Sequence, residues 1–241
     1  MMKPKPRVLN LFHRGLFAIR EVCHGDPARL ERALREDRTH PRFCLLWILM
    51  GGAAYGFTLG LWQWGTPQPL YVAIKIPLLF ILTAVGNGML NGMLAQLLGV
   101  PLSFRESLSA ILTSFAIVAL ILGSLFPVIS LLVLNTPAPD ETGFQTGYSF
   151  TMVFHVLLIA FAGVIANLRL FGLLRRIAPT RTVAMQTLTA WLSGNLLLGS
   201  QLSWNLRPFI GSPHLDVEFF RPDAFSGSFF EALWRSFNHL I

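Results

Sequence analysis

The sequence has 241 residues, of which 53% are hydrophobic and only 13% are charged, whereas about a quarter of the residues of a soluble domain are charged. A water-facing fold of this size would leave large apolar patches exposed, so we exclude a soluble domain. The formal net charge of +7 does not predict nucleic acid binding, because the cytoplasmic loops of membrane proteins carry an excess of Lys and Arg.

Residues 1–42 precede the first long apolar run and are expected to lie in the cytoplasm. They begin with a predicted basic amphipathic helix on the inner leaflet, because apolar residues recur there at helical spacing beside basic ones. The apolar residues are Val8, Leu9, Leu11, Phe12, Leu16 and Ile19, and the basic ones are Lys5, Arg7, Arg14 and Arg20.

A second cytoplasmic helix is predicted to follow. Asp26 is a suitable N-cap, and Pro27 stands at the first helical position. Glu31 lies four residues before Arg35, a spacing that places an ion pair on one helix face. The helix should end before Pro41.

Five apolar stretches are long enough to cross a hydrocarbon core, which takes about 20 helical residues. They are Phe43 to Trp64, Leu70 to Leu98, Leu108 to Leu134, Phe150 to Phe171 and Val183 to Trp204. The first begins too far along the chain to be a cleavable signal peptide, so it should be retained. We therefore expect an all-α integral membrane fold, with a bundle of five transmembrane helices in residues 43–206.

The distribution of basic residues predicts the orientation, because Lys and Arg near the ends of spans stay in the cytoplasm. With the N-terminus inside, that side holds the basic residues up to Arg42 and then Arg105, Arg169, Arg175, Arg176 and Arg181. The outer side holds Lys75, Arg207, Arg221 and Arg235, and its loop from Asn135 to Gly147 contains Asp140 and Glu141 but no basic residue. The expected location is the bacterial inner membrane, with a periplasmic C-terminus. Cys23 and Cys44 then lie on the cytoplasmic side, where thiols stay reduced, so no disulfide is expected.

Residues 207–241 are too polar to cross the membrane and form a predicted tail on the outer face. Gly211, Ser212 and Pro213 indicate a turn. Ser228 and Glu231 have the spacing of a capping box, which predicts a short helix near the end. Its apolar face would consist of Phe230, Leu233, Trp234, Phe237 and Ile241. This helix should lie on the outer membrane surface or against a partner.

The ionisable residues Lys75 and His155 lie inside the predicted spans, and each has a structural and a functional interpretation. Lys75 is about one turn into the second span, where it is either an interfacial anchor or partner of an acidic tail residue, or a substrate or ion contact. His155 lies at a similar depth in the fourth span, where it either hydrogen-bonds a neighbouring helix or belongs to a proton path.

The second and fifth spans contain small and amide residues that predict close helix packing. Asn87 and Asn91 share one face of the second span, beside the small pair Gly88 and Gly92. The fifth span contains Ser193, Gly194, Asn195, Gly199, Ser200 and Gln201, followed by Trp204, Asn205 and Arg207 at the outer interface. Amides that faced lipid would be unpaired, so we expect both polar faces to point into the bundle.

The sequence contains few of the residues that catalysis or ion coupling requires. No Asp or Glu lies within the five predicted spans, and the HExxH, GxSxG and Walker patterns are all missing from the sequence. The sequence therefore predicts no enzyme activity, no cofactor and no metal site, and it argues against proton- or sodium-coupled transport.

Two segments resemble known membrane proteins. The run from Gly99 to Leu108, GVPLSFRESL, leads into an apolar span that reaches Phe126 and Pro127, and it resembles the corresponding segment of bacterial Yip1-family proteins. The helix from Pro27 to Asp37 is similar to that family's cytoplasmic entry. The resemblance implies a five-span bundle with its N-terminus inside and supplies no catalytic residues. The segment from Gln201 to Pro213 departs from that pattern and resembles the C-terminal end of a set of uncharacterised bacterial and cyanobacterial membrane proteins.

Three functions are consistent with these patterns. The first is a non-enzymatic membrane scaffold, assembly factor or accessory subunit that binds other integral membrane proteins and lipid. The second is a small transporter or channel with a polar path near Lys75, His155, Asn87 and Asn195. The third, an intramembrane enzyme that acts on lipid, has only isolated Ser, Thr and His residues to use and ranks last. The residues expected to make the contacts are Lys75, Asn87, Asn91, His155, Asn195, Gln201, Trp204, Arg207, Phe230 and Trp234.

Overall fold

The computed structural model describes residues 26–36, 39–137, 143–210, 216–231 and 234, and within these ranges it is helical without strands. The elements are α2 (Pro27–Glu36), α3 (His40–Gly60), the 3-10 helix η1 (Leu61–Gln63), α4 (Gln68–Leu97), α5 (Phe104–Ser124), α6 (Phe126–Leu134), α7 (Phe144–Ile177) and α8 (Arg181–Leu206). The predicted N-terminal amphipathic helix, the turn at 211–213, and Leu233, Phe237 and Ile241 lie outside the described residues.

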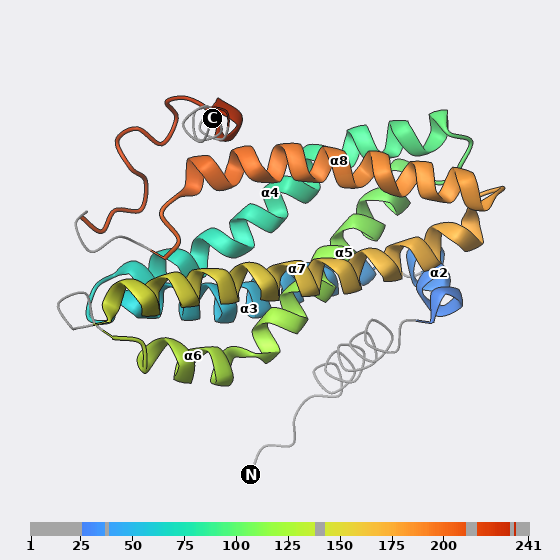
Figure 1. Cartoon of the computed structure of the whole chain (residues 1–241). Coiled ribbons are helices and arrows are strands. Elements are labelled where there is room, and N and C mark those ends of the chain that lie inside the picture. The colour runs from blue at the N-terminus through green and yellow to red at the C-terminus, as the bar shows by residue number, and fades with distance from the viewer. Residues whose placement is uncertain (1–25, 37–38, 138–142, 211–215, 232–233, 235–241) are drawn as a thin grey trace, which may run out of the picture.

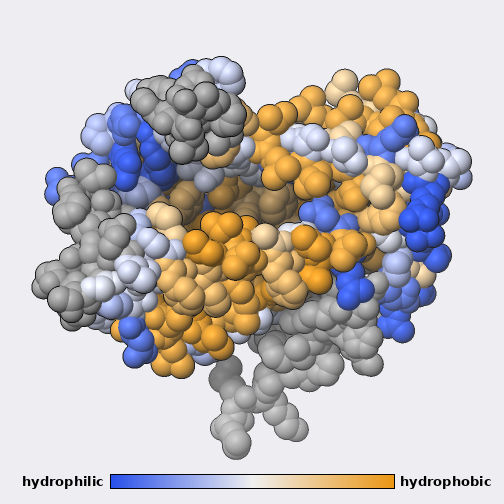
Figure 2. Space-filling view, viewed as in Figure 1, coloured by the Kyte–Doolittle hydropathy of each residue, from blue (hydrophilic) through white to orange (hydrophobic). Residues whose placement is uncertain are grey.

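The long helices run back and forth between the two ends of the molecule (Figure 1). Helix α2 lies at the end where α7 turns into α8, which we call the α2 end. The segment after α8 folds over the opposite end, which we call the tail end. Figure 2 shows apolar side chains in a band between these ends, and hydrophilic side chains gathered toward them. This distribution is typical of a protein whose middle contacts lipid.

Four helical segments of the described chain are long and apolar enough to cross a membrane: His40–Gln63, Gln68–Leu97, Phe104–Ser124 and Thr146–Ile177. The prediction of an all-helical bundle with membrane-length apolar helices is therefore confirmed at this level. Helix α8 has 26 residues, a length of about 39 Å at the helical rise, but it is less apolar than these four. The fifth span stays a prediction.

The third predicted span is wrong as a single helix, because the chain breaks at Leu125 into α5 and α6. The physical reason is Pro127, which lacks a backbone N–H and would collide with the carbonyl of the preceding turn in a helix interior. Proline is tolerated in the first turn, and there Pro127 stands in α6. With nine residues, α6 is too short to cross a membrane and packs instead beside α3.

Helix α3 packs closely on α5 and α4 because glycines remove the side chains at the contacts. A Cβ at Gly51 would collide with the carbonyl oxygen of Ala119 in α5, and one at Gly123 would lie 2.6 Å from the Cα of Gly51. At Gly56 a Cβ would collide with the carbonyl of Val72 in α4. Small residues permit this approach of helix backbones in membrane bundles. The glycines of α3 are visible in the sequence, but we predicted faces for close packing only in the second and fifth spans.

Candidate functional site

The amide residues of α4 and α8 form a buried seam between these helices. Asn87 and Asn91 are both buried, and their Nδ2 atoms donate to Oδ1 of Asn195 at 3.1 and 3.4 Å. Trp191 Nε1 donates to the backbone carbonyl of Asn91 at 2.7 Å. A Cβ at Gly194 would be in ordinary van der Waals contact with both asparagines of α4, so α8 lies directly against the carboxamides at this position. These amides therefore hydrogen-bond across the helix interface, as their expected inward orientation requires.

Lys75 is fully buried in α4 and binds the segment that follows α8. Its Nζ donates to the carbonyl oxygen of Pro208 at 3.0 Å and lies 5.1 Å from the ring centroid of Phe219. We expected an interfacial anchor or a partner for an acidic residue of the tail. The lysine does contact the tail, but through a backbone carbonyl and an aromatic ring, and it forms no ion pair with a carboxylate of the described residues.

Gln68 holds the same turn of the tail and was not identified from the sequence. It is fully buried at the start of α4, and its Nε2 donates to the carbonyl oxygens of Pro208 and Phe209 at 3.3 and 3.1 Å. Its position directly before Pro69 marks a helix start, but nothing in the local sequence indicates a partner 140 residues away. Lys75 and Gln68 thus fix the point at which the chain leaves α8.

The end of α8 makes a second set of contacts with the tail. Arg207 stacks on the ring of Trp204 with Cζ 3.6 Å from the centroid, and its Nη2 lies 2.7 Å from Oδ2 of Asp223. Gln201 donates to Asn205 and accepts from the backbone N–H of Phe229. These contacts fold residues 216–231 back over the tail end.

The predicted short helix of the tail begins where its cap was expected. The backbone N–H of Glu231 donates to Oγ of Ser228 at 3.1 Å. Phe230 and Trp234, the two described residues of its predicted apolar face, are both exposed. Phe220 and Phe225 are exposed in the same segment. The tail is therefore held in place by polar contacts while several of its aromatic side chains face outward.

His155 lies in α7 and contacts α3 through one ring nitrogen. Its Nδ1 is 3.1 Å from the hydroxyl of Tyr55, whereas its buried Nε2 has no hydrogen-bond partner in the part of the chain that the structure describes. The histidine lines a cavity of about 400 Å³ bounded by α3, α4, α7 and the segment after α8. Lys75 and His155 therefore lie near the same end of the bundle, but they contact different groups.

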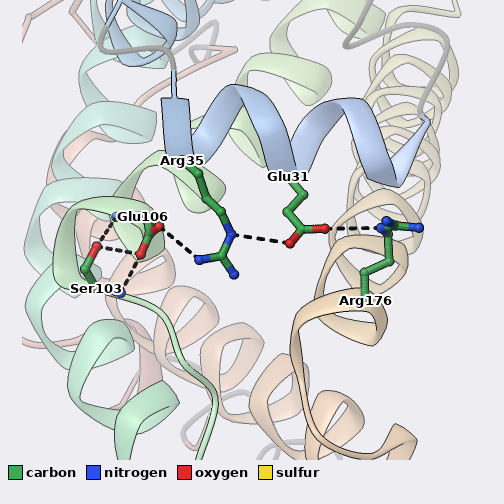
Figure 3. Close-up of polar contacts among 5 residues, drawn as sticks. All are labelled: Glu31, Arg35, Ser103, Glu106 and Arg176. Carbon is green, nitrogen blue, oxygen red and sulfur yellow. Dashed lines mark hydrogen bonds and ion pairs between the residues drawn. The ribbon is translucent and has the colours of Figure 1, made fainter.

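At the α2 end, a network of charged residues joins three helices (Figure 3). Glu31 of α2 pairs with Arg35, as its spacing predicted, and also with Arg176 of α7, both at 3.3 Å. Arg35 extends to Glu106 of α5 at 3.6 Å, and Glu106 closes a capping box with Ser103. Asp26 caps α2 as expected. Exposed ion pairs add little stability, so the network chiefly orients α2 across the ends of α5 and α7.

Within the described residues, no cluster of three or more His, Cys, Asp or Glu side chains has an arrangement suited to a metal ion. Comparison of the chain with protein families, with curated proteins and with solved structures finds no match. The resemblance to the Yip1 family accordingly stays a prediction from the sequence segments that carry it.

Proposed function

We propose that the protein is an integral component of the bacterial inner membrane, with α3, α4, α5, α7 and α8 as its five spans. The four apolar helical segments and the length of α8 support this arrangement. The basic residues at the α2 end support a cytoplasmic position for that end, and the tail end then faces the periplasm. The proposed relation to the Yip1 family has the same topology and depends on sequence alone.

This topology is tested with reporter fusions and chemical labelling. A reporter that is active only outside the cytoplasm should be active when fused after Ile241. A cysteine in place of Arg175 or Arg176 should resist a membrane-impermeant reagent added to intact cells. Labelling of these positions from outside, or recovery of the protein dispersed in buffer without detergent, would refute the proposal.

Within that membrane, we propose a non-enzymatic scaffold, assembly factor or accessory subunit that binds other membrane proteins. One observation carries this proposal: the tail is fixed on the bundle by Lys75, Gln68 and Arg207 while it presents exposed aromatic side chains. A rigidly held aromatic patch is typical of protein interfaces, because the side chains lose little conformational freedom on binding. Its position at the tail end suits a partner with a domain at the membrane surface.

The experiment compares complexes purified in mild detergent by quantitative mass spectrometry. Phe225→Ser and Trp234→Ser remove side chains that are 76% and 65% exposed, so the bundle should fold unchanged. Val153→Ser, which changes a 59% exposed position of α7, is the control. We expect the wild type and the control to retain the same larger complex and the tail variants to lose it. A solitary monomer in all four samples, or one complex unchanged by the tail substitutions, would refute the scaffold.

The alternative, a small transporter or channel, depends on the cavity beside His155. Against it, Lys75 and Asn87 are twelve positions apart on α4 (75 to 87), which is about 18 Å along the helix. In addition, the amides of Asn87 and Asn91 already donate hydrogen bonds to Asn195. Flux through reconstituted vesicles that disappears in both Lys75→Ala and His155→Ala would favour the transporter.

A further inference from the structure

The cavity beside His155 has the shape of a binding groove that opens on the side of the bundle. Its apolar wall includes Leu59, Ile76, Leu79, Val156 and Ile159. Figure 2 shows the apolar band hollowed between α7 and α8, the helices on either side of the groove. Val156 and Ile159 are themselves exposed, so the opening lies on the face that would contact lipid. A volume of about 400 Å³ falls within the usual range of ligand pockets.

The tail end of the groove carries positive charge that no described carboxylate balances. Arg221 lines the cavity, and among the residues that the structure describes none forms a hydrogen bond or ion pair with its side chain. Lys75 is close enough for the two cations to repel each other. Asp223, a nearby acid, is paired with Arg207. Lys75 is fully buried and Arg221 is half-buried. Cations that have lost part of their hydration are stabilised by a nearby anion, so this end of the groove is suited to an anion.

His155 lines the wall of the groove, and its Nε2 has no hydrogen-bond partner among the described residues. Its side chain is only 2% exposed, and Nε2 itself has almost no accessible surface, so a ligand in the groove does not reach this nitrogen. The guanidinium of Arg221 is therefore the group of the groove that an anion would contact.

We propose that the groove binds one anionic phospholipid. The headgroup phosphate accepts hydrogen bonds from Arg221, and an acyl chain lies along the apolar wall that includes Leu59, Ile76 and Val156. An apolar groove that opens sideways between spans favours a lipid over a soluble anion, because an acyl chain enters from the bilayer without passing through water. The inference rests on the proposed membrane insertion and names the lipid class and the site.

The test is native mass spectrometry of the delipidated full-length protein titrated with dioleoylphosphatidylglycerol, dioleoylphosphatidylcholine, oleate or inorganic phosphate. We expect one phosphatidylglycerol per chain, bound about tenfold more tightly than phosphatidylcholine. Both lipids carry the phosphate, but the choline cation of phosphatidylcholine would be repelled by the cationic end of the groove at Arg221. Arg221→Gln should abolish the preference. Arg105→Gln, which changes an exposed arginine outside the groove, should retain it.

A second pair of variants separates the groove from general lipid contact. Val156→Trp should fill the groove and prevent binding, whereas Val153→Trp changes a position of similar exposure, 59% against 64%, that does not line it. Thermal unfolding without lipid checks that both variants fold. The proposal would be overturned if phosphatidylcholine, oleate or inorganic phosphate bound as tightly as phosphatidylglycerol. It would also be overturned if the two variants of either pair bound phosphatidylglycerol equally. Partner binding through the tail is measured separately, so either proposal can fail alone.

Discussion

The amide seam between α4 and α8 gives a direct test of what holds these helices together. Asn195→Leu keeps a similar side-chain volume but removes the oxygen that accepts from both Asn87 and Asn91. Two buried amide groups would then lose the acceptor that Asn195 provides across the interface. The variant should therefore unfold more readily than the wild type.

The magnitude follows from the two distances. The contact at 3.1 Å is a good hydrogen bond and the one at 3.4 Å is long and weak. Interhelical hydrogen bonds in membranes average about 0.6 kcal/mol and reach about 1.7 kcal/mol, so the loss should be about 1–2 kcal/mol. Replacing Asn87, Asn91 and Asn195 together by Leu should recover most of it, because no unpaired amide remains.

The assay is reversible unfolding of the purified protein in mixed micelles with increasing SDS, followed by tryptophan fluorescence. Asn167→Leu is the matched control, because that amide donates only to Gly163 of its own helix and should change stability little. If Asn195→Leu unfolds at the wild-type SDS fraction, or the triple variant is as unstable as the single one, the seam does not stabilise the interface in this way.

Three other variants test the remaining contacts. Gly51→Ala should lower the thermal midpoint of unfolding in detergent, because the added Cβ would collide with the backbone of Ala119. In the control Gly163→Ala, the added Cβ meets no atom within 4 Å, so the midpoint should stay the same or rise through helix propensity. Equal midpoints for the two variants would contradict the close packing. Lys75→Met should release the tail at Pro208 and speed its cleavage by chymotrypsin after Phe209 or Phe219 at least severalfold, and unchanged cleavage would show that this contact does not hold it. Glu31→Gln removes the ion pair with Arg176 and should lower the free energy of unfolding by less than about 1 kcal/mol. This loss should disappear in high salt. A larger loss, or one that salt does not change, would refute a purely orienting role of the network.

The parts of the fold that follow local rules could be predicted from the sequence. Apolar runs of membrane length identify α3, α4 and α7, and the order Asp26, Pro27 marks the start of α2. Pro127 lies inside the third run, Leu108 to Leu134, and proline disfavours a helix interior. However, Pro77 lies inside the unbroken helix α4, so a proline alone does not identify the break between α5 and α6.

The partners of the candidate residues could not be predicted, because they depend on which distant segments meet. Lys75 binds a carbonyl 133 residues away, and any residue offers such a carbonyl, so no side-chain pattern identifies it. Glu31 shows the same limit: its spacing to Arg35 is a local property, whereas its contact with Arg176 requires α2 to lie across the end of α7. The cavity beside His155 is a matter of shape and has no sequence signal.

For α8, the proposed fifth span, the mean apolarity of the whole helix hides a difference between its two faces. The face toward α4 carries Asn195, with Trp191 and Thr187 fully buried, and it lowers the average of the helix. The opposite face exposes Leu196 and Leu197. Polar residues that face a bundle interior are compatible with a membrane position, whereas two exposed leucines on a helix outside the bilayer would contact water. The division of α8 into a paired polar face and an exposed apolar face therefore supports its proposed place as the fifth span.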